Sequence, residues 1–368
     1  MADKTISVAI LGTRGVPNRY GGFEACAEKL GLYLAGAGHD VSIYCGSDHP
    51  VKEHSWKGIK RIMIRNPENR WGSFGQFIYD LYCNLHSRKQ DFDIVLHLGY
   101  TSDSVWHFLW TKRSIHIVNM DGLEWKRQKY GRLTKRFLRY AEKLAGKHAD
   151  NLIADNPEIE RLLKMKYKNP IDMIPYGADI PASLSVDHLS AFGLLPHQYD
   201  LIVARMEPEN NIVEAIEAKL EGNDTIPLAV IGNKNDYKAQ LQKRYRDKRG
   251  IVFLDPVYDP LRLNSIRHYS RYYVHGHSVG GTNPSLLEAM ACQCNILAHD
   301  NLFNRSVLEG HALFFAHKDD LKSAFSEQPS PEFVTWKENN MNKIRNKYNW
   351  EFVTASYEEL FRNAIDHK

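Results

Sequence analysis

Short apolar segments typical of strands alternate with amphipathic segments typical of helices over most of this chain. Such an alternation predicts the α/β fold class, with parallel sheets covered by helices on both faces and ligands at the carboxyl ends of the strands. In the first half we expect strands at residues 6–11, 41–44, 59–64, 93–98, 115–119, 151–154 and 171–174, and helices at 23–34, 74–85 and 132–147. In the second half we expect strands at residues 201–204, 228–231, 251–254, 272–275, 295–298 and 313–315, and helices at 212–220, 237–246, 261–268 and 350–365.

A turn-rich junction, Pro175-Tyr176-Gly177-Ala178-Asp179, separates the two runs of alternation. A chain of 368 residues is longer than one typical hydrophobic core organises. We therefore predict two Rossmann-like domains that face a central cleft, residues 1–178 and residues 179–349. The last helix, within residues 350–368, is far from the first domain in sequence but is expected to pack back on it.

The composition excludes several classes of protein. With 43% hydrophobic and 25% charged residues, the chain resembles an ordinary globular protein. No apolar run reaches the ~20 residues that span a bilayer, and the first residues, MADKTISVAIL, lack the pattern of a secretion signal. The five cysteines form no CxxC pair, which favours reduced thiols and a cytoplasmic location over a disulfide framework. A net charge of +4 gives no global case for nucleic-acid binding.

One stretch of the second half, residues 275–294, has the features of an anion site. It reads HGHSVGGTNPSLLEAMACQC and passes from the end of an expected strand through two glycines into a helix. Asn283 can cap that helix and Pro284 fits its first turn. Free N–H groups and the helix dipole then favour a phosphate, and Glu288, one turn into the helix, can accept hydrogen bonds from hydroxyls. A phosphate site beside a hydroxyl-binding carboxylate suggests a nucleotide-sugar.

A second glycine-rich loop, residues 12–22, follows the first expected strand. Its sequence, GTRGVP, is not GxGxxG, the following helix begins about ten residues too late, and no acidic residue ends the second strand to bind a ribose. These differences disfavour a dinucleotide cofactor, so we expect none. They favour a long glycine loop that lets a bulky substrate approach the backbone. Arg14 and Arg19 in this loop could meet a phosphate or simply be solvated.

Two further residues are candidates for catalysis because each follows an expected strand. Asp121 could orient an acceptor hydroxyl or steady positive charge on a sugar carbon, but an Asp before Gly122 could equally cap a turn. Arg205 could neutralise a diphosphate leaving group, or it could be a surface residue paired with Glu207 or Glu209.

Two patterns resemble metal sites, yet we expect no bound metal. Asp91-Phe92-Asp93 resembles a metal-binding DxD, but it precedes a strand and therefore lies at the wrong end for ligands. His275 and His277 have no companion ligand at a recognisable spacing, so a structural or substrate-contacting pair is favoured.

Residues 126–147 carry nine Lys or Arg and one acid, Glu142. The helix Arg132–Lys147 is predicted to pack an apolar stripe against the sheet and to present a basic surface. That surface could contact an anionic membrane, grip an acidic acceptor or be merely solvated. Nucleic acid is disfavoured because no aromatic stacking pattern accompanies the charge. The stripe consists of Leu133, Phe137, Tyr140 and Leu144.

Several motifs together resemble retaining GT-B glycosyltransferases of family four, and most closely the bacterial rhamnosyltransferases of cell-surface polysaccharide assembly such as lipopolysaccharide or capsule. They span nearly the whole chain. The motifs are GTRGVPNRYGGFE at residues 12–24, DGLEWKR at 121–127, IPYGAD at 174–179, ARMEPENNI at 204–212 and residues 275–292.

The resemblance implies that the second domain binds a nucleoside diphosphate-sugar and the first domain binds the acceptor. Glu288 matches a ribose-binding glutamate, Arg205 matches a diphosphate-binding arginine, and Asp121 lies beside the position of a histidine that is usual at the end of the strand. The implied donor-binding residues are Asn210, Gly280, Gly281, Thr282, Asn283, Ser285 and Glu288, and those of the glycine loop and acceptor side are Gly12, Arg14, Gly15, Gly21 and Gly22.

Three positions depart from the family pattern. Gly280 replaces a glutamate, Asn210 replaces a lysine, and Met120 stands where a histidine is usual. We interpret these changes as an altered donor preference, for example for dTDP-L-rhamnose, whose methyl group suits an apolar site. The expected acceptor is a lipid-linked saccharide at the inner face of the plasma membrane. The alternatives are another donor such as a UDP-hexose, a catalytically silent binding scaffold, and a nicotinamide dehydrogenase.

Overall fold

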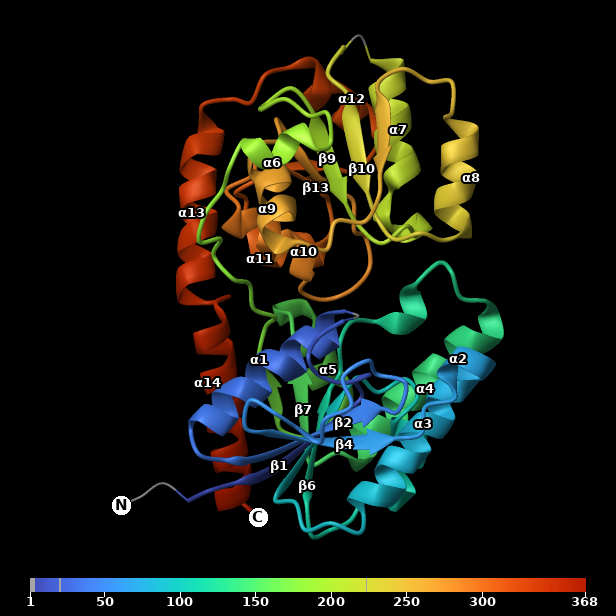
Figure 1. The fold of residues 1–368 in the computed structure, drawn as a ribbon, viewed down its shortest axis with the longest axis vertical. Coiled ribbons are helices and arrows are strands. Elements are labelled where there is room, and N and C mark those ends of the chain that lie inside the picture. Colours follow the sequence, from blue (N-terminus) through green and yellow to red (C-terminus); the bar gives the residue numbers. More distant parts are fainter. Residues whose placement is uncertain (1–3, 20, 223) are drawn as a thin grey trace. The chain divides into compact units, whose positions relative to one another are not determined.

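The computed structural model describes residues 4–19, 21–222 and 224–368, which form two compact units (Figure 1). Unit 1 contains the described residues up to Lys126, together with Tyr130–Tyr176 and Trp350–Lys368. Unit 2 contains Arg127–Lys129 and Gly177–Asn349. Among the residues that the structure describes, no helix is both long and apolar enough to cross a membrane.

Unit 1 is built on an eight-stranded sheet with the order β3-β4-β2-β1-β5-β6-β7-β8, in which only β3 is antiparallel to its neighbour. The strands are β1 (Ser7–Leu11), β2 (Asp40–Gly46), β3 (Ser55–Trp56), β4 (Ile59–Ile64), β5 (Ile94–Leu98), β6 (Ile115–Asn119), β7 (Asn151–Ala154) and β8 (Ile171–Met173). The helices are α1 (Gly22–Gly36), α2 (Glu68–Trp71), α3 (Ser73–Ser87), α4 (Arg132–His148), α5 (Pro157–Lys166) and α14 (Trp350–Asp366), with short 3₁₀ turns η1 (Ser104–Leu109) and η2 (Glu124–Lys126).

The last helix completes the core of unit 1. Its Tyr357 and Phe361 are buried in one cluster with residues of α1, β1 and β5. The Tyr357 hydroxyl accepts a 3.0 Å hydrogen bond from the Asn119 side chain at the end of β6. Because α14 covers apolar side chains of α1 and β1, the end of the chain is an integral part of this unit.

Unit 2 has a six-stranded parallel sheet with the order β11-β10-β9-β12-β13-β14. Its strands are β9 (Asp200–Val203), β10 (Leu228–Ile231), β11 (Ile251–Leu254), β12 (Tyr273–His275), β13 (Ile296–His299) and β14 (Leu313–Phe315). The surrounding helices are α6 (Asp187–Ser190), η3 (Pro208–Asn210), α7 (Ile212–Glu221), α8 (Asp236–Arg244), α9 (Pro260–His268), α10 (Pro284–Ala291), α11 (Leu302–Leu308), α12 (Lys318–Ser326) and α13 (Glu332–Asn346).

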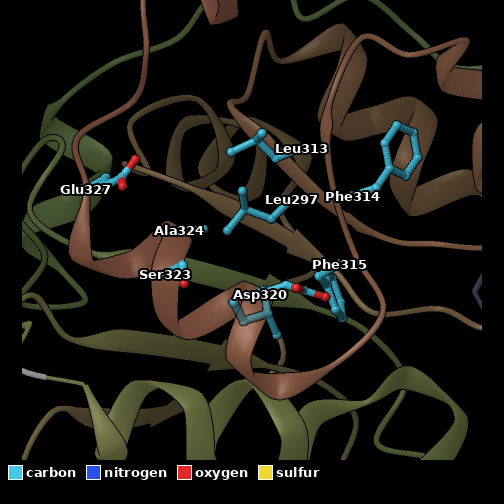
Figure 2. A pocket seen from close by; sticks show the side chains of 9 residues that line it. Leu297, Leu313, Phe314, Phe315, Asp320, Ser323, Ala324 and Glu327 are labelled. Atoms are coloured by element: carbon cyan, nitrogen blue, oxygen red, sulfur yellow. The ribbon is translucent and has the colours of Figure 1, made fainter.

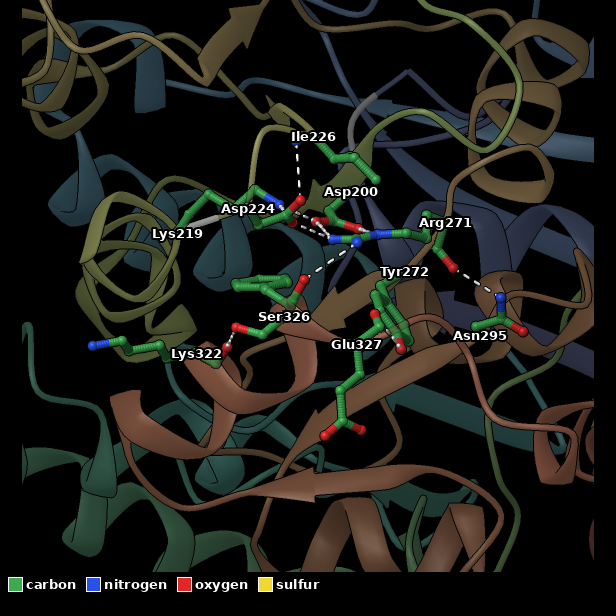
Figure 3. A network of polar contacts seen from close by, with 11 residues as sticks. Asp200, Lys219, Asp224, Ile226, Arg271, Tyr272, Asn295, Lys322, Ser326 and Glu327 are labelled. Atoms are coloured by element: carbon green, nitrogen blue, oxygen red, sulfur yellow. Dashed lines mark hydrogen bonds and ion pairs between the residues drawn. The ribbon is translucent and has the colours of Figure 1, made fainter. Parts of the chain in front are cut away.

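A buried ion cluster fixes the amino ends of β9 and β12 (Figure 3). The fully buried carboxylate of Asp200 accepts hydrogen bonds from Arg271, at 2.7 and 2.9 Å, and from Lys219 at 2.6 Å. Asp224 accepts from the same two cations. Since two cations face two carboxylates, the buried charges compensate one another. The cluster lies at the edge of the sheet opposite to the carboxyl ends, so its role is structural.

The expected packing of the basic helix is wrong. The buried residues of α4 include Leu138, Ala141 and Ala145, whereas Leu133 is 81% exposed and Tyr140 is 56% exposed. Small side chains let α4 approach its neighbours closely, so the side with Ala141 and Ala145 faces the core. The stripe of larger residues, which was expected to face the core, lies on the outer side.

Candidate functional site

Arg205 lies just beyond the carboxyl end of β9 and is exposed. Within the described ranges its guanidinium makes no hydrogen bond or ion pair with another side chain. Arg205 forms no ion pair with Glu207 or Glu209 in the described chain, and the ion-pair partners of these carboxylates are Arg127 and Lys129. The charge of Arg205 still reaches Glu207, because, against the effect of burial, the hydrogen bond from Lys129 and then the charge of Arg205 lower the pKa of that carboxylate. Arg127 lies 3.5 Å from Glu207, and Lys129 donates a 2.8 Å hydrogen bond to the same carboxylate. Arg205 therefore places an exposed positive charge, with Glu207 nearby, at the ligand-binding edge of this sheet.

The segment after β9 packs directly on the loop after β12. Ser278 donates to the backbone carbonyl of Glu209 through its hydroxyl, at 2.8 Å, and through its N–H, at 3.1 Å. The Asn211 amide donates to the Gly276 carbonyl at 2.7 Å. A Cβ atom at Gly276 would lie 2.1 Å from the Asn210 carbonyl oxygen, so only glycine permits this approach. The contacts hold the loop beside the segment that carries Arg205.

Asn210 supports this loop through the buried side chain of His277. The Asn210 amide nitrogen donates to the Arg205 carbonyl at 2.6 Å, and its Oδ1 lies 2.7 Å from His277 Nδ1. Because Oδ1 can only accept, His277 Nδ1 is the donor of this hydrogen bond. In a neutral ring His277 Nε2 is then an acceptor. Burial, followed by the charges of His275, Arg127 and Arg205, lowers the pKa of His277 well below its usual range, so the ring stays neutral.

Gly280 lies directly over that ring. Its φ is +136°, and a Cβ atom there would come within 2.8 Å of His277 Nε2. A glutamate at this position would have to move the histidine and adopt a backbone conformation that L-residues avoid. The backbone N–H groups of Gly280 and Gly281 donate no hydrogen bond within the described part of the chain. Two donors of the predicted phosphate loop are thus available.

The predicted helix start at the end of this loop is present as α10. The side chain of Asn283 accepts the N–H of Ser285 at 2.9 Å, and Pro284 is the first helical residue. The Ser285 hydroxyl contacts the Val203 carbonyl at 3.1 Å and the Tyr273 hydroxyl at 2.6 Å. Ser285 is therefore committed to anchoring α10 on the sheet, while Thr282 is buried inside the loop.

The carboxylate of Glu288 is fixed by Arg267, which was not singled out in the sequence. Arg267 lies on α9, its side chain is only 3% exposed, and its Nη2 pairs with one oxygen of Glu288. The same nitrogen lies 3.4 Å from the Ser285 hydroxyl, and Nη1 donates to Asn264 at 3.1 Å. Glu288 is 43% exposed, and within the described chain its second oxygen has no partner. That oxygen can accept a hydrogen bond from a ligand hydroxyl.

In unit 1 the loop after β1 lies against the carboxyl end of β5. Gly12 has a φ of +84°, and a Cβ atom there would lie 2.3 Å from the Leu98 carbonyl oxygen. Gly15 has a φ of +117°, and a Cβ atom there would lie 2.7 Å from the Cys45 side chain. Both positions require glycine, because a side chain would force the loop off the sheet.

Arg14 in this loop is tied to acidic side chains rather than left exposed to bind an anion. Its Nε donates to Glu68 at 2.8 Å, and its backbone N–H donates to the buried carboxylate of Glu24 at 3.0 Å. Gly21 and Gly22 begin α1, and the hydroxyl of Tyr176 donates to the Gly22 carbonyl. The first turn of α1 carries the carboxylate of Glu24, whose Oε2 would lie 3.5 Å from a Cβ atom on Gly21, so this helix start is already occupied by a negative charge.

Asp121 stands two residues beyond β6, at the same edge of this sheet. Its φ is +48°, which is uncommon for a residue other than glycine, and its N–H donates to the Asn119 side chain at 2.9 Å. Backbone strain of this kind clusters at functional sites. Nearby Tyr100 is buried, and burial together with the charges of Glu142, Glu124 and Asp121 raises the pKa of its hydroxyl, so it remains a neutral donor.

Both carboxylates of the first metal-like pattern have structural partners. Asp93 accepts the N–H of Ser7 at 2.9 Å at the amino end of the sheet, and Asp91 pairs with Arg113 at 3.2 Å. Burial, followed by the charge of His299, lowers the pKa of His275 to about 3. Among residues 4–19, 21–222 and 224–368, no group of three or more His, Cys, Asp or Glu could hold a metal ion.

One cavity of about 280 Å³ lies elsewhere in unit 2, between β13, β14 and α12 (Figure 2). Its lining includes Leu297, Leu313, Phe315 and Glu327, and none of the predicted site residues. The candidate donor site therefore lies outside this pocket.

Two parallel α/β units, each with its loops at the carboxyl ends of the strands, define the GT-B fold. The sucrose-phosphate synthase of Thermosynechococcus elongatus has a TM-score of 0.82 at 16% sequence identity, over 98% of this chain and 99% of that chain. A glycosyltransferase from Rickettsia africae has a TM-score of 0.73 at 15% identity, with 100% of both chains covered. Anabaena HepE in complex with UDP has a TM-score of 0.74 at 13% identity, over 97% of this chain and 100% of that chain.

Similarity in sequence to known proteins is more limited than similarity in structure. Residues 5–179 match a family described as "Domain of unknown function (DUF1972)". No curated protein matches the chain significantly. The fold is thus shown, and the roles of the site residues stay predictions.

Proposed function

We propose that this protein is a metal-independent, retaining glycosyltransferase that moves a sugar from a nucleoside diphosphate-sugar to an acceptor hydroxyl. The observation that carries the proposal is the exposed guanidinium of Arg205, which has no partner side chain within the described residues and follows β9. It lies close enough to His277 for its charge to lower the pKa of that ring. The phosphate loop at Gly280 and Gly281 follows the neighbouring strand, β12.

The reaction needs the site to stabilise a leaving diphosphate. The bond between the anomeric carbon and the phosphate oxygen breaks, and a bond to the acceptor oxygen forms on the same face. The acceptor proton passes to the leaving diphosphate. Arg205 and the N–H groups of the phosphate loop supply the compensating positive charge. Asp121 is assigned the acceptor side, where it would steady positive charge on the sugar carbon or orient the hydroxyl.

For the donor we favour dTDP-L-rhamnose, on the resemblance described above. Gly280 supports this choice, because it stands where the family pattern has a glutamate, and a Cβ atom there would lie 2.8 Å from His277 Nε2. A UDP-hexose is the second candidate, since HepE, which shares the fold, has been solved with UDP-glucose. The acceptor we propose is a lipid-linked saccharide of surface polysaccharide synthesis at the cytoplasmic face of the membrane.

A donor panel tests this proposal. Purified protein is incubated with dTDP-L-rhamnose, UDP-glucose and other nucleotide-sugars, together with a sugar–diphosphate–lipid acceptor. NMR then gives the anomeric configuration of the product. We expect transfer with retention from one donor. Nucleotide binding without transfer or hydrolysis across the panel would instead identify a silent scaffold, and tight NADH binding in a fluorescence titration would favour a dehydrogenase.

A further inference from the structure

The outward-facing side of α3 in unit 1 is apolar. Phe74 is 66% exposed and Leu85 is 40% exposed, with Ile78 and Leu81 partly exposed between them. Their spacing of four, three and four residues places them on one line along the helix. Polar side chains normally occupy the exposed face of a surface helix. Packing within unit 1 does not explain why these apolar side chains lie on the exposed face of α3.

A second exposed apolar line runs along α4 and joins the first. Leu133 and Tyr140 are mostly exposed, and Phe137 between them is partly exposed. The rings of Phe137 and Phe77 are 5.5 Å apart, which connects α4 to α3. The turn η1 packs on both helices and adds Phe108, which is 62% exposed. Figure 1 shows α3 and α4 side by side in unit 1.

The exposed charged side chains of these two helices are all basic. The helices α3 and α4 contain one acidic residue each, Asp80 and Glu142, and both are buried. No carboxylate of either helix reaches the outer surface. The basic side chains of α4 are Arg132, Lys135, Arg136, Arg139, Lys143 and Lys147.

We propose that this surface, formed by the outer sides of α3, η1 and α4, binds an anionic phospholipid bilayer. The exposed apolar side chains enter the headgroup boundary while the Lys and Arg side chains pair with lipid phosphates. The absence of carboxylates on the outer side of α3 and α4 favours an anionic lipid over a partner protein of mixed charge. Membrane binding rests on the proposed function, because a lipid-linked acceptor would require the protein to work at a membrane surface.

Vesicle flotation with the full chain tests the proposal without any turnover. We expect the protein to float with vesicles that contain phosphatidylglycerol, not with pure phosphatidylcholine, and to be released by salt. Two double variants probe the two parts of the surface, Phe74→Ser with Leu133→Ser and Arg136→Glu with Lys143→Glu. Each should lower the bound fraction on the order of tenfold. Val334→Ser with Arg345→Glu, at exposed positions of α13 in unit 2, serves as the matched control.

Circular dichroism first confirms that each variant is folded. Equal binding to neutral vesicles, no binding at all, or equal losses in the control would overturn the proposal. So would dimerisation of the wild type that the Phe74→Ser and Leu133→Ser variant abolishes, because the surface would then cover a second copy. Vesicle binding without sugar transfer would refute only the enzymatic function, and transfer to a soluble acceptor without vesicle binding would refute only the surface.

Discussion

The buried guanidinium of Arg267 holds one oxygen of the half-exposed carboxylate of Glu288 and leaves the other oxygen open. A hydrogen bond to a charged group contributes about 1.5–3 kcal/mol of free energy, so a ligand hydroxyl bound to the open oxygen would add measurably to donor binding. We expect Glu288→Gln to raise the KM for the donor about tenfold with a smaller effect on kcat. Glu221→Gln, at an exposed position of α7, is the control and should change neither constant.

Arg267 is predicted to act through Glu288 as a positioning residue. Arg267→Lys keeps the charge but loses the planar fork that reaches Glu288, Ser285 and Asn264 together. We expect the KM for the donor to rise in this variant, with no further rise when Glu288→Gln is added. A double-mutant cycle on donor KM measures this coupling, and strictly additive effects would contradict the positioning role.

Gly280 should tolerate no side chain. The conformation with φ of +136° costs a non-glycine residue about 1–3 kcal/mol, and the contact with His277 adds to that cost. We expect Gly280→Ala to lower the free energy of unfolding in urea by at least about 1 kcal/mol. Gly36→Ala is the control, because that glycine ends α1 with open space around its Cβ position. An unchanged midpoint for Gly280→Ala would show that the loop adapts freely.

Stability should fall as the solution becomes mildly acidic. His275 and His116 have folded-state pKa values of about 3, lowered by burial and then by a neighbouring histidine, against 6.5 for an unperturbed histidine. Below 6.5 the unfolded state binds protons that the folded state cannot, so each residue lowers the free energy of unfolding by about 1.4 kcal/mol per pH unit. Urea unfolding between about pH 7 and about pH 5 measures the loss. A flat profile across this window would contradict the assignment.

The ion cluster around Asp200 should be essential for the stability of unit 2. Asp200→Asn leaves the buried cations Lys219 and Arg271 undercompensated, and we expect a loss of about 3–5 kcal/mol in the free energy of unfolding. The exposed pair of Lys234 and Asp255 provides the control, since Asp255→Asn should cost less than about 1 kcal/mol. Comparable losses in the two variants would contradict this account of the cluster.

Much of the fold could be predicted because its strands are short apolar runs bounded by turns. The expected strand at residues 228–231 coincides with β10, and the expected strand at 115–119 coincides with β6. The orientation of α4 could not be predicted in the same way, because its pattern contains two apolar stripes. The periodicity of the larger side chains favoured the side of Leu133 and Tyr140, although the buried side of α4 is the one that carries Ala141 and Ala145.

The capped start of α10 was predictable because one segment carries it. The loop and cap at residues 280–284 lie together in sequence and in space. Arg267 could not be found, because it is 21 residues from Glu288 and nothing in its helix marks it. Arg127 belongs to the DGLEWKR motif, but its ion pairs with Glu207 and Glu209 could not be predicted, because they join segments about 80 residues apart.

The central claim is that unit 2 has a nucleoside diphosphate site that depends on Arg205. Isothermal titration of UDP and dTDP into the wild type and into Arg205→Ala tests it most directly, with uridine and thymidine as ligands that lack phosphates. Arg244→Ala, at an exposed position on α8, is the control. We predict that Arg205→Ala weakens binding of both diphosphates at least about tenfold and leaves nucleoside binding unchanged. Equal diphosphate affinity in the wild type and in Arg205→Ala would contradict the account.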